Sequence, residues 1–249
     1  MATPLQTLTT PRRNKLLAFL DDDDMARLEP SLQHVSLDFQ QELYDYRQSV
    51  SHIHFPLSGV VAIMRTLSDG DTAQVASVGN EGVVGYGALI DAPVASGRAI
   101  VQLPGEALRI ETAAIQNYAL KHPWFRAVTM HYGHTLISQL MQSVVCHQFH
   151  SARQRYALWM LQTHDRAHRD TFRLTQEIVA QSLGVRRATV SDIARDVQKS
   201  GAVEYRRGVI TVRDRAALMA QACECYVALQ EEYARLLKVP DPVPERGGA

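Results

Sequence analysis

The chain has 249 residues, of which 46% are hydrophobic, and its 26 basic and 26 acidic side chains give a formal net charge of zero. This size suits one large or two modest globular domains with buried cores. No apolar run approaches the ~20 residues of a membrane-spanning helix. Residues 1–20 lack a secretory signal pattern, so we expect a cytoplasmic protein without a membrane partner.

The charge is distributed unevenly along the chain. Residues 151–215 carry 13 Lys and Arg against 7 Asp and Glu, a net charge of +6. Residues 1–150 have a net charge of −4, and residues 216–249 have one of −2. Because clustered Lys and Arg bind phosphate groups, the neutral total hides one basic segment that is suited to nucleic acid.

Two short helices are predicted at the start of the chain, after residues 1–11, which are polar and which we expect to be disordered. The first helix covers residues 12–20. Its apolar side chains are Leu16, Leu17, Phe19 and Leu20. The acidic run 21–24 precedes the second helix. Carboxylates cap helix N-termini, and no Gly turn is present to spread calcium ligands, so we interpret the run as a cap.

A β-like pattern begins near His34 and continues to Ile110. Seven short runs alternate with turns that contain Gly, Pro or Asp: residues 35–37, 42–44, 52–55, 59–63, 72–78, 99–102 and 107–110. Many short strands with regular turn signals are typical of an antiparallel β-roll or jelly roll. We therefore expect a β-roll domain over residues 12–120.

A long amphipathic helix is predicted over residues 125–145, within a segment that spans 121–148. Its apolar side chains recur at spacings of three and four: Phe125, Val128, Tyr132, Leu136, Leu140 and Val144, with Ile137 and Met141 widening the stripe. The stripe could pack against its own β-roll or against the same helix of a second copy. We prefer a dimer, because the stripe is long and one small domain offers little room to bury it.

Four histidines and one cysteine lie on or near this helix: His131, His134, His147, His150 and Cys146. Imidazole and thiolate groups bind zinc or iron, but helix histidines are more often solvated, so we assign no metal ligand and no cofactor. The remaining cysteines, Cys223 and Cys225, either pack a C-terminal helix or act as a thiol sensor if exposed. Three cysteines form no disulfide framework and fit a reducing compartment.

The segment 174–212 predicts two helices, a tight turn and a β-hairpin. Thr175 can cap the first helix through its hydroxyl, and Gly184 can end it in a left-handed conformation. The second helix begins at about Arg187 and has apolar residues at spacings of three and four. This order is that of a helix-turn-helix followed by a wing. The hairpin strands are residues 203–205 and 209–212.

The flanking segments complete the C-terminal half. We assign residues 149–215 to a DNA-binding domain and residues 216–249 to a C-terminal extension. A helix over 153–162 precedes the helix-turn-helix, and a polar loop over 164–170 follows that helix. The extension is predicted to be helical over 215–238 and loose beyond, because its end is rich in proline and polar residues.

The predicted recognition surface combines donors from both helices and the wing. The second helix fits the major groove, where arginine reads guanine edges or holds phosphates, and Ser or Thr contacts either. We expect DNA contacts from Thr175, Gln176, Arg186, Arg187, Thr189, Ser191, Arg206 and Arg207. The alternative is a plain helical hairpin with a solvated basic face, which the hairpin and the placement of the arginines disfavour.

The same segment resembles the C-terminal winged helix of the Crp/Fnr family of bacterial transcription regulators. The residues that match the family pattern are Leu174, Thr175, Ala180, Leu183, Gly184, Arg187, Thr189, Val190, Ser191, Gly208 and Ile210. Three positions depart from it, namely Arg186, Ala188 and Asp192, so the family's common target half-site is not carried over. Arg187 remains the expected base reader.

The β-like half also resembles this family, in residues 55–61, 80–85 and 104–107. The resemblance implies an α+β fold with three parts. These are an N-terminal antiparallel β-roll (a cyclic-nucleotide-binding-like jelly roll), a long central dimerisation helix and a C-terminal winged helix-turn-helix. It also implies a homodimer on double-stranded DNA, with half-sites one DNA turn apart, and RNA polymerase as a further partner.

Cyclic-nucleotide-binding members of the family carry a Gly-Glu-Leu element, whose carboxylate takes the ribose hydroxyl, and an arginine that meets the cyclic phosphate. Here the first element is Gly85-Tyr86-Gly87, without a carboxylate, and the second holds Arg98 about one residue out of register. A buried ribose and phosphate need both partners. We therefore expect no cyclic AMP binding in the usual mode. Gly85, Tyr86 and Arg98 remain candidate ligand residues, and a solvated or salt-bridged Arg98 is the alternative.

The leading hypothesis is a homodimeric, sequence-specific DNA-binding transcription regulator whose β-roll senses an unknown signal. The alternatives are a cyclic-nucleotide-, redox- or metal-responsive sensor of the same fold, and a signalling module without DNA binding. The family's iron–sulfur members use N-terminal cysteines, whereas the first cysteine here is Cys146. We do not expect an enzyme, because the sequence lacks nucleophile-elbow, phosphate-loop and His-Glu-x-x-His motifs.

Overall fold

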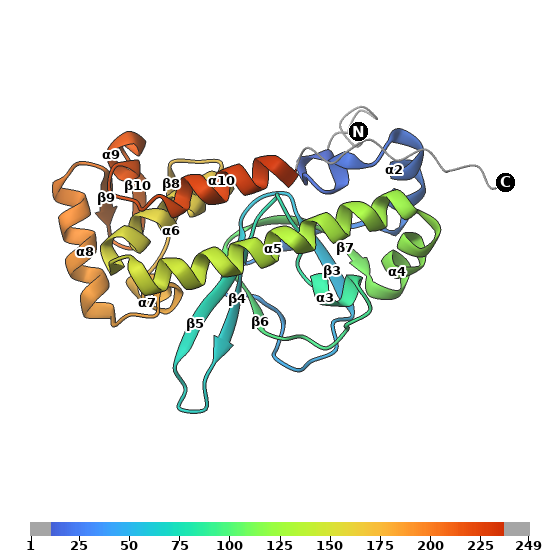
Figure 1. Cartoon of the computed structure of the whole chain (residues 1–249), viewed down its shortest axis with the longest axis horizontal. Helices are drawn as coiled ribbons and strands as arrows, with labels where there is room; N and C mark the ends of the chain where they lie inside the picture. Colours follow the sequence, from blue (N-terminus) through green and yellow to red (C-terminus); the bar gives the residue numbers. More distant parts are fainter. Residues whose placement is uncertain (1–10, 237–249) are drawn as a thin grey trace.

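The computed structural model describes residues 11–236. An N-terminal β-roll lies beside the first part of the long helix α5 (Pro123–Phe149), and a C-terminal helical head lies beside its last part (Figure 1). The predicted order of β-roll, long helix and helix-turn-helix is confirmed, and the fold is of the α+β class. Between residues 11 and 236, no helix combines the length and the apolar composition that crossing a membrane requires.

The helix predicted over 12–20 is wrong. The segment forms two single 3₁₀ turns, η1 (Pro11–Arg13) and η2 (Leu17–Phe19). Asn14 interrupts it, because its buried side chain donates to the carbonyl oxygens of Pro56 and Gly82, each at 2.9 Å, and accepts from the backbone N–H groups of the next turn. The leucines of this segment are nevertheless buried against the roll, as expected.

The acidic run does cap a helix. Asp21 accepts a hydrogen bond from the backbone N–H of Asp24 at 2.7 Å and begins α2 (Asp22–Leu28), which is followed by the 3₁₀ turn η3 (Glu29–Ser31). Three carboxylates then lie in the first helical turn. They complement the positive end of the helix dipole, and the predicted cap is confirmed.

All seven predicted strands form. They are β1 (Gln33–Leu37), β2 (Glu42–Tyr44), β3 (His52–Pro56), β4 (Val60–Thr66), β5 (Thr72–Val78), β6 (Arg98–Leu103) and β7 (Gly105–Glu111). They pair antiparallel in one sheet of order β1-β7-β3 and a second of order β2-β6-β4-β5. Side chains of both sheets are buried inside the roll, among them Ile53, Phe55, Val61 and Val101.

The sequence patterns miss two helices of the roll. Gly85 takes a left-handed φ of +94° before the single-turn helix α3 (Tyr86–Leu89), so most of the Gly85-Tyr86-Gly87 element is helical. Helix α4 (Thr112–Lys121) buries Ile115 and Tyr118 and leads into α5. Two apolar residues three positions apart are too short a pattern to distinguish a helix from a loop.

Helix α5 uses its apolar stripe in two ways. Phe125, Val128 and Tyr132 are buried in the core of the roll. Further along, the stripe is exposed, at Ile137, Leu140, Met141 and Val144. The first half of the stripe therefore packs on its own roll, which was the alternative interpretation, and the second half is uncovered in a single chain.

The C-terminal head is built around the predicted helix-turn-helix. Its elements are α6 (Ala152–Ala167), β8 (Thr171–Arg173), α7 (Gln176–Leu183), α8 (Arg187–Lys199), β9 (Val203–Arg206), β10 (Val209–Val212), α9 (Arg215–Met219) and α10 (Cys225–Leu236). The strands form an antiparallel sheet of order β8-β10-β9. The polar loop predicted over 164–170 is wrong in its first half, because Arg166 and Ala167 are buried residues of α6.

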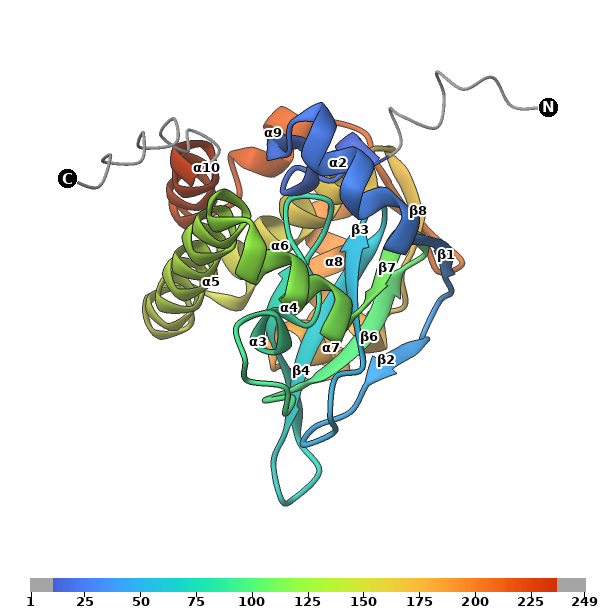
Figure 2. The ribbon, with the colours of Figure 1, turned by 90° about the vertical axis from the view of Figure 1, so that its right-hand side faces the viewer.

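The predicted C-terminal helix is two helices rather than one. The chain turns between α9 and α10, and this region contributes Leu218, Cys223, Cys225 and Leu229 to the core of the head. Helix α10 also lies along α5 (Figure 2). The predicted loose tail lies beyond residue 236 and so falls outside the described residues, as does nearly all of the polar segment 1–11.

Candidate DNA-binding surface and sensor site

Two residues of the predicted motif set the ends of α7. The Thr175 hydroxyl accepts a hydrogen bond from the backbone N–H of Ile178 at 3.3 Å and caps the helix. Gly184 ends the helix with a φ of +61°, a left-handed conformation that is strained for a residue with a Cβ atom. Both predicted roles are confirmed, and they place α8 immediately after the turn.

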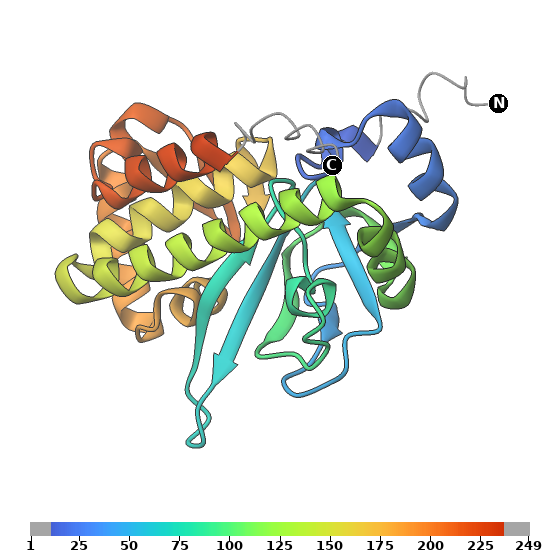
Figure 3. The ribbon, with the colours of Figure 1, turned by 45° about the vertical axis from the view of Figure 1, so that its right-hand side comes forward.

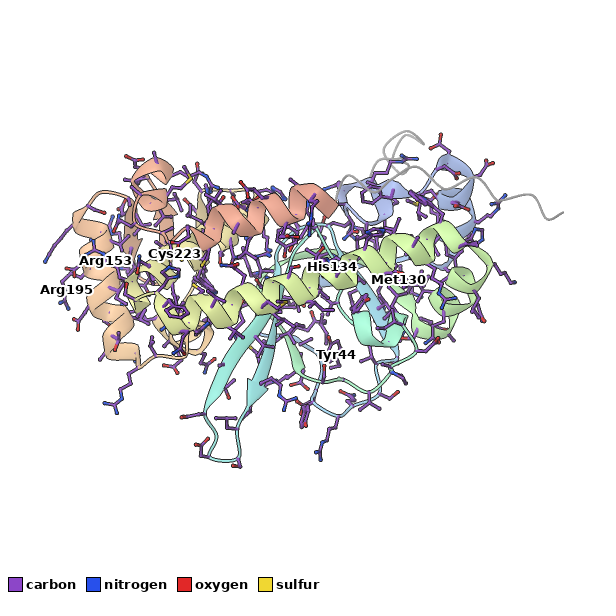
Figure 4. All side chains as sticks on the ribbon, viewed as in Figure 1. Tyr44, Met130, His134, Arg153, Arg195 and Cys223 are labelled. Atoms are coloured by element: carbon purple, nitrogen blue, oxygen red, sulfur yellow. The ribbon has the colours of Figure 1, made fainter. Side chains whose placement is uncertain are left out.

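Helix α8 has one buried and one exposed face. The residues packed in the core of the head are Val190, Ile193, Ala194 and Val197, as predicted. The residues exposed at its start and along the opposite face include Arg186, Arg187, Thr189, Asp192 and Arg195. Arg195 extends from the outer side of the head in Figure 4. The exposed face offers the hydrogen-bond donors that reading a major groove requires.

Two of the expected contact residues bind each other. The Ser191 hydroxyl lies 2.7 Å from the side-chain oxygen of Gln176 and 3.1 Å from the backbone carbonyl oxygen of Arg187. A hydroxyl has one proton to donate. Ser191 therefore has no proton left for a phosphate oxygen while it makes these contacts, whereas the side-chain NH₂ group of Gln176 remains a donor.

The wing is a β-hairpin with a two-residue turn. Arg206 at the end of β9 pairs with Val209 of β10, and the turn residues Arg207 and Gly208 have φ values of +51° and +77°. Two successive positive φ values are typical of a type I′ turn, in which Gly suits the second position. Both arginines are exposed, so the wing presents two guanidinium groups to solvent.

A cleft separates the helix-turn-helix from the β4–β5 hairpin of the roll. It has a volume of about 1020 Å³, with Arg186, Arg187 and Thr189 on one wall and Arg65 and Asp71 on the other. The hairpin projects from the roll next to the head (Figure 3). The expected DNA-reading side chains therefore line the same cleft as a hairpin of mixed charge, and a duplex must share that space or displace the hairpin.

A buried ion pair joins the head to the roll. The Arg166 guanidinium of α6 donates to Glu81 at 2.8 Å, to the Ser77 hydroxyl at 3.0 Å and to the Tyr233 hydroxyl at 3.3 Å. Burial alone would raise the pKa of Glu81, but the charge and hydrogen bonds of Arg166 hold that pKa below its ordinary value. Because both side chains are buried, losing one leaves an unpaired buried charge.

A second polar contact ties the roll to the helix-turn-helix itself. Gln102 on β6 donates to the Ser182 hydroxyl of α7 at 2.7 Å and to the side-chain oxygen of Gln74 on β5 at 3.1 Å. Trp159 on α6 also donates to Gln74, at 3.4 Å. A shift of β5 or β6 would therefore move the first helix of the DNA-reading motif or break these bonds.

The structure places the candidate ligand residues of the roll in different surroundings. Tyr86 packs edge-on against Tyr132 of α5, with ring centroids 5.7 Å apart, and burial raises the pKa of Tyr86. Arg98 makes an ion pair with Glu42 at 2.7 Å, on paired strands β6 and β2. A guanidinium that is already paired with a carboxylate is poorly placed to hold a cyclic phosphate.

A hollow beside Tyr86 is large enough for a small ligand. It has a volume of about 390 Å³ and is lined by α3, α4 and α5, through residues such as Gln116, Met130 and His134. Figure 4 labels Met130 and His134 on α5. Small-molecule sites commonly span about 300–1,000 Å³. The hollow also includes Ile137, so it borders the exposed half of the α5 stripe.

The three cysteines are buried, and they lie together with His150. Burial, together with the neighbouring thiols, raises the pKa of Cys146 above the usual thiol range. Of the two roles considered for Cys223 and Cys225, burial supports packing, because an inert buried thiol is a poor sensor of oxidants. The other histidines of α5 are exposed, namely His131, His134 and His147.

A β-roll joined through a long helix to a winged helix-turn-helix defines a DNA-binding regulator with a sensor domain. Comparison with protein families gives the same division. The model of the cyclic nucleotide-binding domain matches residues 35–122, and the model of the Crp-like helix-turn-helix domain matches residues 154–221. Together the two models match more than half of the chain. The chain belongs to the Crp/Fnr family, whose members are transcription regulators rather than enzymes.

Solved structures share this fold at low sequence identity. FixK2 from Bradyrhizobium japonicum is 16% identical with a TM-score of 0.66, covering 77% of this chain and 98% of its own. The c-di-GMP responsive global regulator CLP from Xanthomonas campestris is 12% identical with a TM-score of 0.63, covering 77% and 99%. A CRP-family transcriptional regulator from Thermus thermophilus is 18% identical with a TM-score of 0.63, covering 76% and 96%. No curated protein matches the chain by sequence.

Proposed function

We propose that the protein is a homodimeric, sequence-specific transcription regulator that binds double-stranded DNA through α8 and the wing. The observation that carries the proposal is the exposure of Arg186, Arg187 and Thr189 at the start of a helix whose other face is buried in the head. They lie in the segment 151–215, whose net charge is +6. The proposed place of action is the cytoplasm, where chromosomal DNA and RNA polymerase are its partners.

In the proposed complex, α8 enters the major groove by its N-terminal end. Arg187 contacts a base edge, because a guanidinium can pair with both acceptor atoms of guanine. Arg186 and the wing residues Arg206 and Arg207 neutralise phosphates, and Thr189 and Gln176 add polar contacts. Thr175 and Ser191 use their hydroxyl groups in internal hydrogen bonds, and these bonds hold α7 and α8 in place.

The exposed apolar side chains of α5 form the proposed dimer interface. The residues Met130, Ile137, Leu140 and Val144 recur at spacings of seven, three and four, and all are exposed. Apolar side chains at this period pack two helices side by side, and an uncovered apolar stripe is typical of an interaction surface. Two copies joined in this way carry two heads, which suits half-sites one DNA turn, about 34 Å, apart.

The signal is proposed to differ from cyclic AMP bound in the family's usual mode. Residues 85–87 offer no carboxylate for a ribose, and Arg98 is paired with Glu42. The structurally similar regulator CLP is described as responsive to c-di-GMP, so cyclic AMP is not the sole signal read by this fold. The hollow beside Tyr86 is the first place to search for a ligand, because it adjoins both the roll and the proposed dimer helix.

Selection of bound sequences from random duplex DNA tests the proposal. The full-length protein is incubated with the pool in parallel arms without additive, with cyclic AMP and with small molecules extracted from bacterial cells. A two-fold symmetric site enriched equally in the first two arms is the expected result. Enrichment that needs cyclic AMP would keep DNA binding and overturn the ligand part, and no enrichment in any arm would overturn the DNA-binding part.

Light scattering tests the dimer separately. At micromolar concentration the protein should have twice the mass of one 27.8 kDa chain. Ile137→Glu places a charge within the stripe and should shift the protein toward the monomer. Leu67→Glu changes an equally exposed apolar residue at the tip of the β4–β5 hairpin and should leave the dimer intact. A monomeric wild type would refute the interface.

A further inference from the structure

Four potential metal ligands converge where α5 meets the head. Cys146 and His150 lie one turn apart at the C-terminal end of α5, and Cys223 and Cys225 lie at the turn before and the start of α10. The four ligand atoms all lie within 4.8 Å of one another, and the three thiols are buried. Cys223 is labelled near the end of α5 in Figure 4. The proposed DNA-binding function makes no use of this cluster.

Two of the six spacings between the ligand atoms are close to the edges of a tetrahedral zinc site, and all six are within 4.8 Å. Zinc binds thiolate sulfur at about 2.3 Å and imidazole nitrogen at about 2.0 Å, so the edges of a Cys₃His tetrahedron measure about 3.8 Å between sulfurs and about 3.6 Å from sulfur to nitrogen. The sulfur atoms of Cys146 and Cys223 are 3.6 Å apart, and Cys225 Sγ lies 3.4 Å from His150 Nδ1. The fold already holds the side chains close to the positions that a zinc ion requires.

The surrounding polar groups also fit a metal centre. The second ring nitrogen of His150, Nε2, lies 3.2 Å from the carboxylate of Glu224, an arrangement that orients a metal-bound histidine and fixes its tautomer. The side-chain N–H of Gln142 donates to Cys225 Sγ at 2.9 Å, which stabilises a thiolate more than a thiol. Each of these contacts is made to a different ligand of the cluster, so they support the site independently.

We propose that Cys146, His150, Cys223 and Cys225 bind one zinc ion in a closed tetrahedral site. All four positions are taken by protein side chains, which is typical of structural rather than catalytic zinc. On binding, each thiol releases its proton to solvent, and no residue changes its oxidation state. The ion clamps the end of α5 to the turn between α9 and α10, so it fixes the proposed dimer helix to the DNA-binding head.

The competing use of the same residues is a disulfide between Cys146 and Cys223. Their sulfur atoms would have to close from 3.6 Å to about 2.05 Å. A disulfide would also leave Cys225 and His150 without a shared role, although these two are in contact and each has its own polar partner. The zinc site accounts for all four groups together.

Metal titration of the full-length protein tests the site. The chain is purified under reducing conditions, its zinc content is measured, the metal is removed with a chelator, and zinc or cobalt ions are added back. We expect one zinc per chain. Cobalt should give the ligand-field bands and the thiolate charge-transfer absorption of a tetrahedral sulfur-rich site. A reduced chain that takes up neither ion at equimolar concentration would overturn the proposal.

Matched histidine variants test the ligand set without altering a cysteine. His150→Asn removes a ligand and should weaken cobalt binding at least tenfold and change the spectrum. His147→Asn changes an exposed histidine three positions before His150, and should leave both the affinity and the spectrum unchanged. Glu224→Gln should weaken binding about tenfold through the orientation of His150. Equal binding by the His150 and His147 variants would refute the assignment.

Mass spectrometry without reductant distinguishes the disulfide. A chain that is lighter by two hydrogen atoms, carries no zinc and takes up no metal after reduction would assign Cys146 and Cys223 to a redox pair and overturn the zinc site. Thermal unfolding adds a second readout, because zinc should raise the melting temperature of the wild type but not of the Cys223→Ser, Cys225→Ser double variant. If that variant does not fold, the cobalt spectra of the histidine variants decide.

Discussion

The candidate functional side chains of the head and of the roll differ in their exposure and in their contacts. Among the described residues 11–236, Arg186 and Arg187 of the head are exposed and make no ion pair. In the roll, by contrast, Arg98 is paired with Glu42 and Tyr86 is packed on Tyr132. The proposed DNA surface is exposed, whereas the candidate ligand residues of the roll are engaged by other side chains of the protein. The proposed DNA-binding residues are therefore free to contact a partner, whereas the candidate nucleotide residues already have partners within the protein.

The two regions are nevertheless joined, and the largest expected effect comes from breaking the buried ion pair between them. Arg166→Met removes the cation and leaves Glu81 buried without a partner, so the free energy of unfolding should fall by about 3–5 kcal/mol. Urea unfolding followed by circular dichroism measures the loss. The double variant with Glu81→Leu should recover most of it, because no unpaired charge remains. A single variant within about 1 kcal/mol of the wild type would mean that the junction is not locked.

Lowering the pH should reduce the free energy of unfolding through protonation of His54, a buried residue of the roll. Burial, and then the charges of Arg109 and His52, lower the pKa of His54 to about 4. Between this value and the ordinary pKa of about 6.5, the unfolded chain binds a proton that the folded chain does not. The contribution of His54 to the free energy of unfolding is therefore fully present above about pH 6.5. It falls by about 3 kcal/mol as the pH approaches 4.

Unfolding measurements across this pH range check the contribution of His54. His54→Gln has no such proton to bind, so its stability should depend less steeply on pH than that of the wild type. His134→Gln alters an exposed histidine of α5 and should keep the wild-type slope. Parallel slopes for the wild type and His54→Gln would show that acid acts elsewhere than at this residue of the roll.

The next largest effect is on DNA affinity, and it tests whether the exposed arginines of the head contact DNA. Arg187→Ala should weaken binding to the selected site by about 1–3 kcal/mol, roughly 5–150-fold, and relax the preference at one base pair. Arg207→Ala should weaken binding to all sequences alike and reduce the slope of log affinity against log salt by about 1. Fluorescence anisotropy with selected and scrambled duplexes at several salt concentrations measures both.

A matched arginine control keeps this test specific. Arg27 is exposed on α2, in the roll, and is paired with Asp24 as an ordinary surface residue. Arg27→Ala should bind DNA like the wild type. If Arg187→Ala behaves like Arg27→Ala at every salt concentration, α8 is not the recognition helix. The proposal that the exposed face of the head binds DNA through α8 would then be refuted.

The parts of this molecule that could be predicted from the sequence are set by neighbouring residues. The seven strands follow from short β-rich runs between turn residues, and Thr175 and Gly184 mark the two ends of α7 through their own side chains and backbone preferences. The alternation of exposed and buried residues along α8 follows from helical spacing. These signals act over a few residues, so they can be read without knowledge of the fold.

The parts that could not be predicted join residues far apart in the chain. Arg166 and Glu81 are separated by 85 positions, and Cys146 and Cys223 by 77. Asn14 ends an otherwise plausible helical pattern because its partners belong to the roll. No local pattern encodes such pairs. The available hints were an arginine within the expected polar loop and two cysteines separated by one residue, and neither indicates its partner.

The smallest effect is expected at Arg98, whose ion pair with Glu42 leaves the two side chains 44% and 40% exposed. Exposed pairs contribute about 0–1 kcal/mol, so Arg98→Ala should leave the free energy of unfolding nearly unchanged. Calorimetric titration with cyclic AMP should give no signal for the wild type or for this variant. Glu42→Ala frees Arg98 and shows whether the pairing alone blocks a nucleotide. If the wild type binds cyclic AMP at micromolar concentration and Arg98→Ala does not, the contrast between roll and head disappears. The ion pair would then be the resting state of a working nucleotide site, which the ligand opens by displacing Glu42.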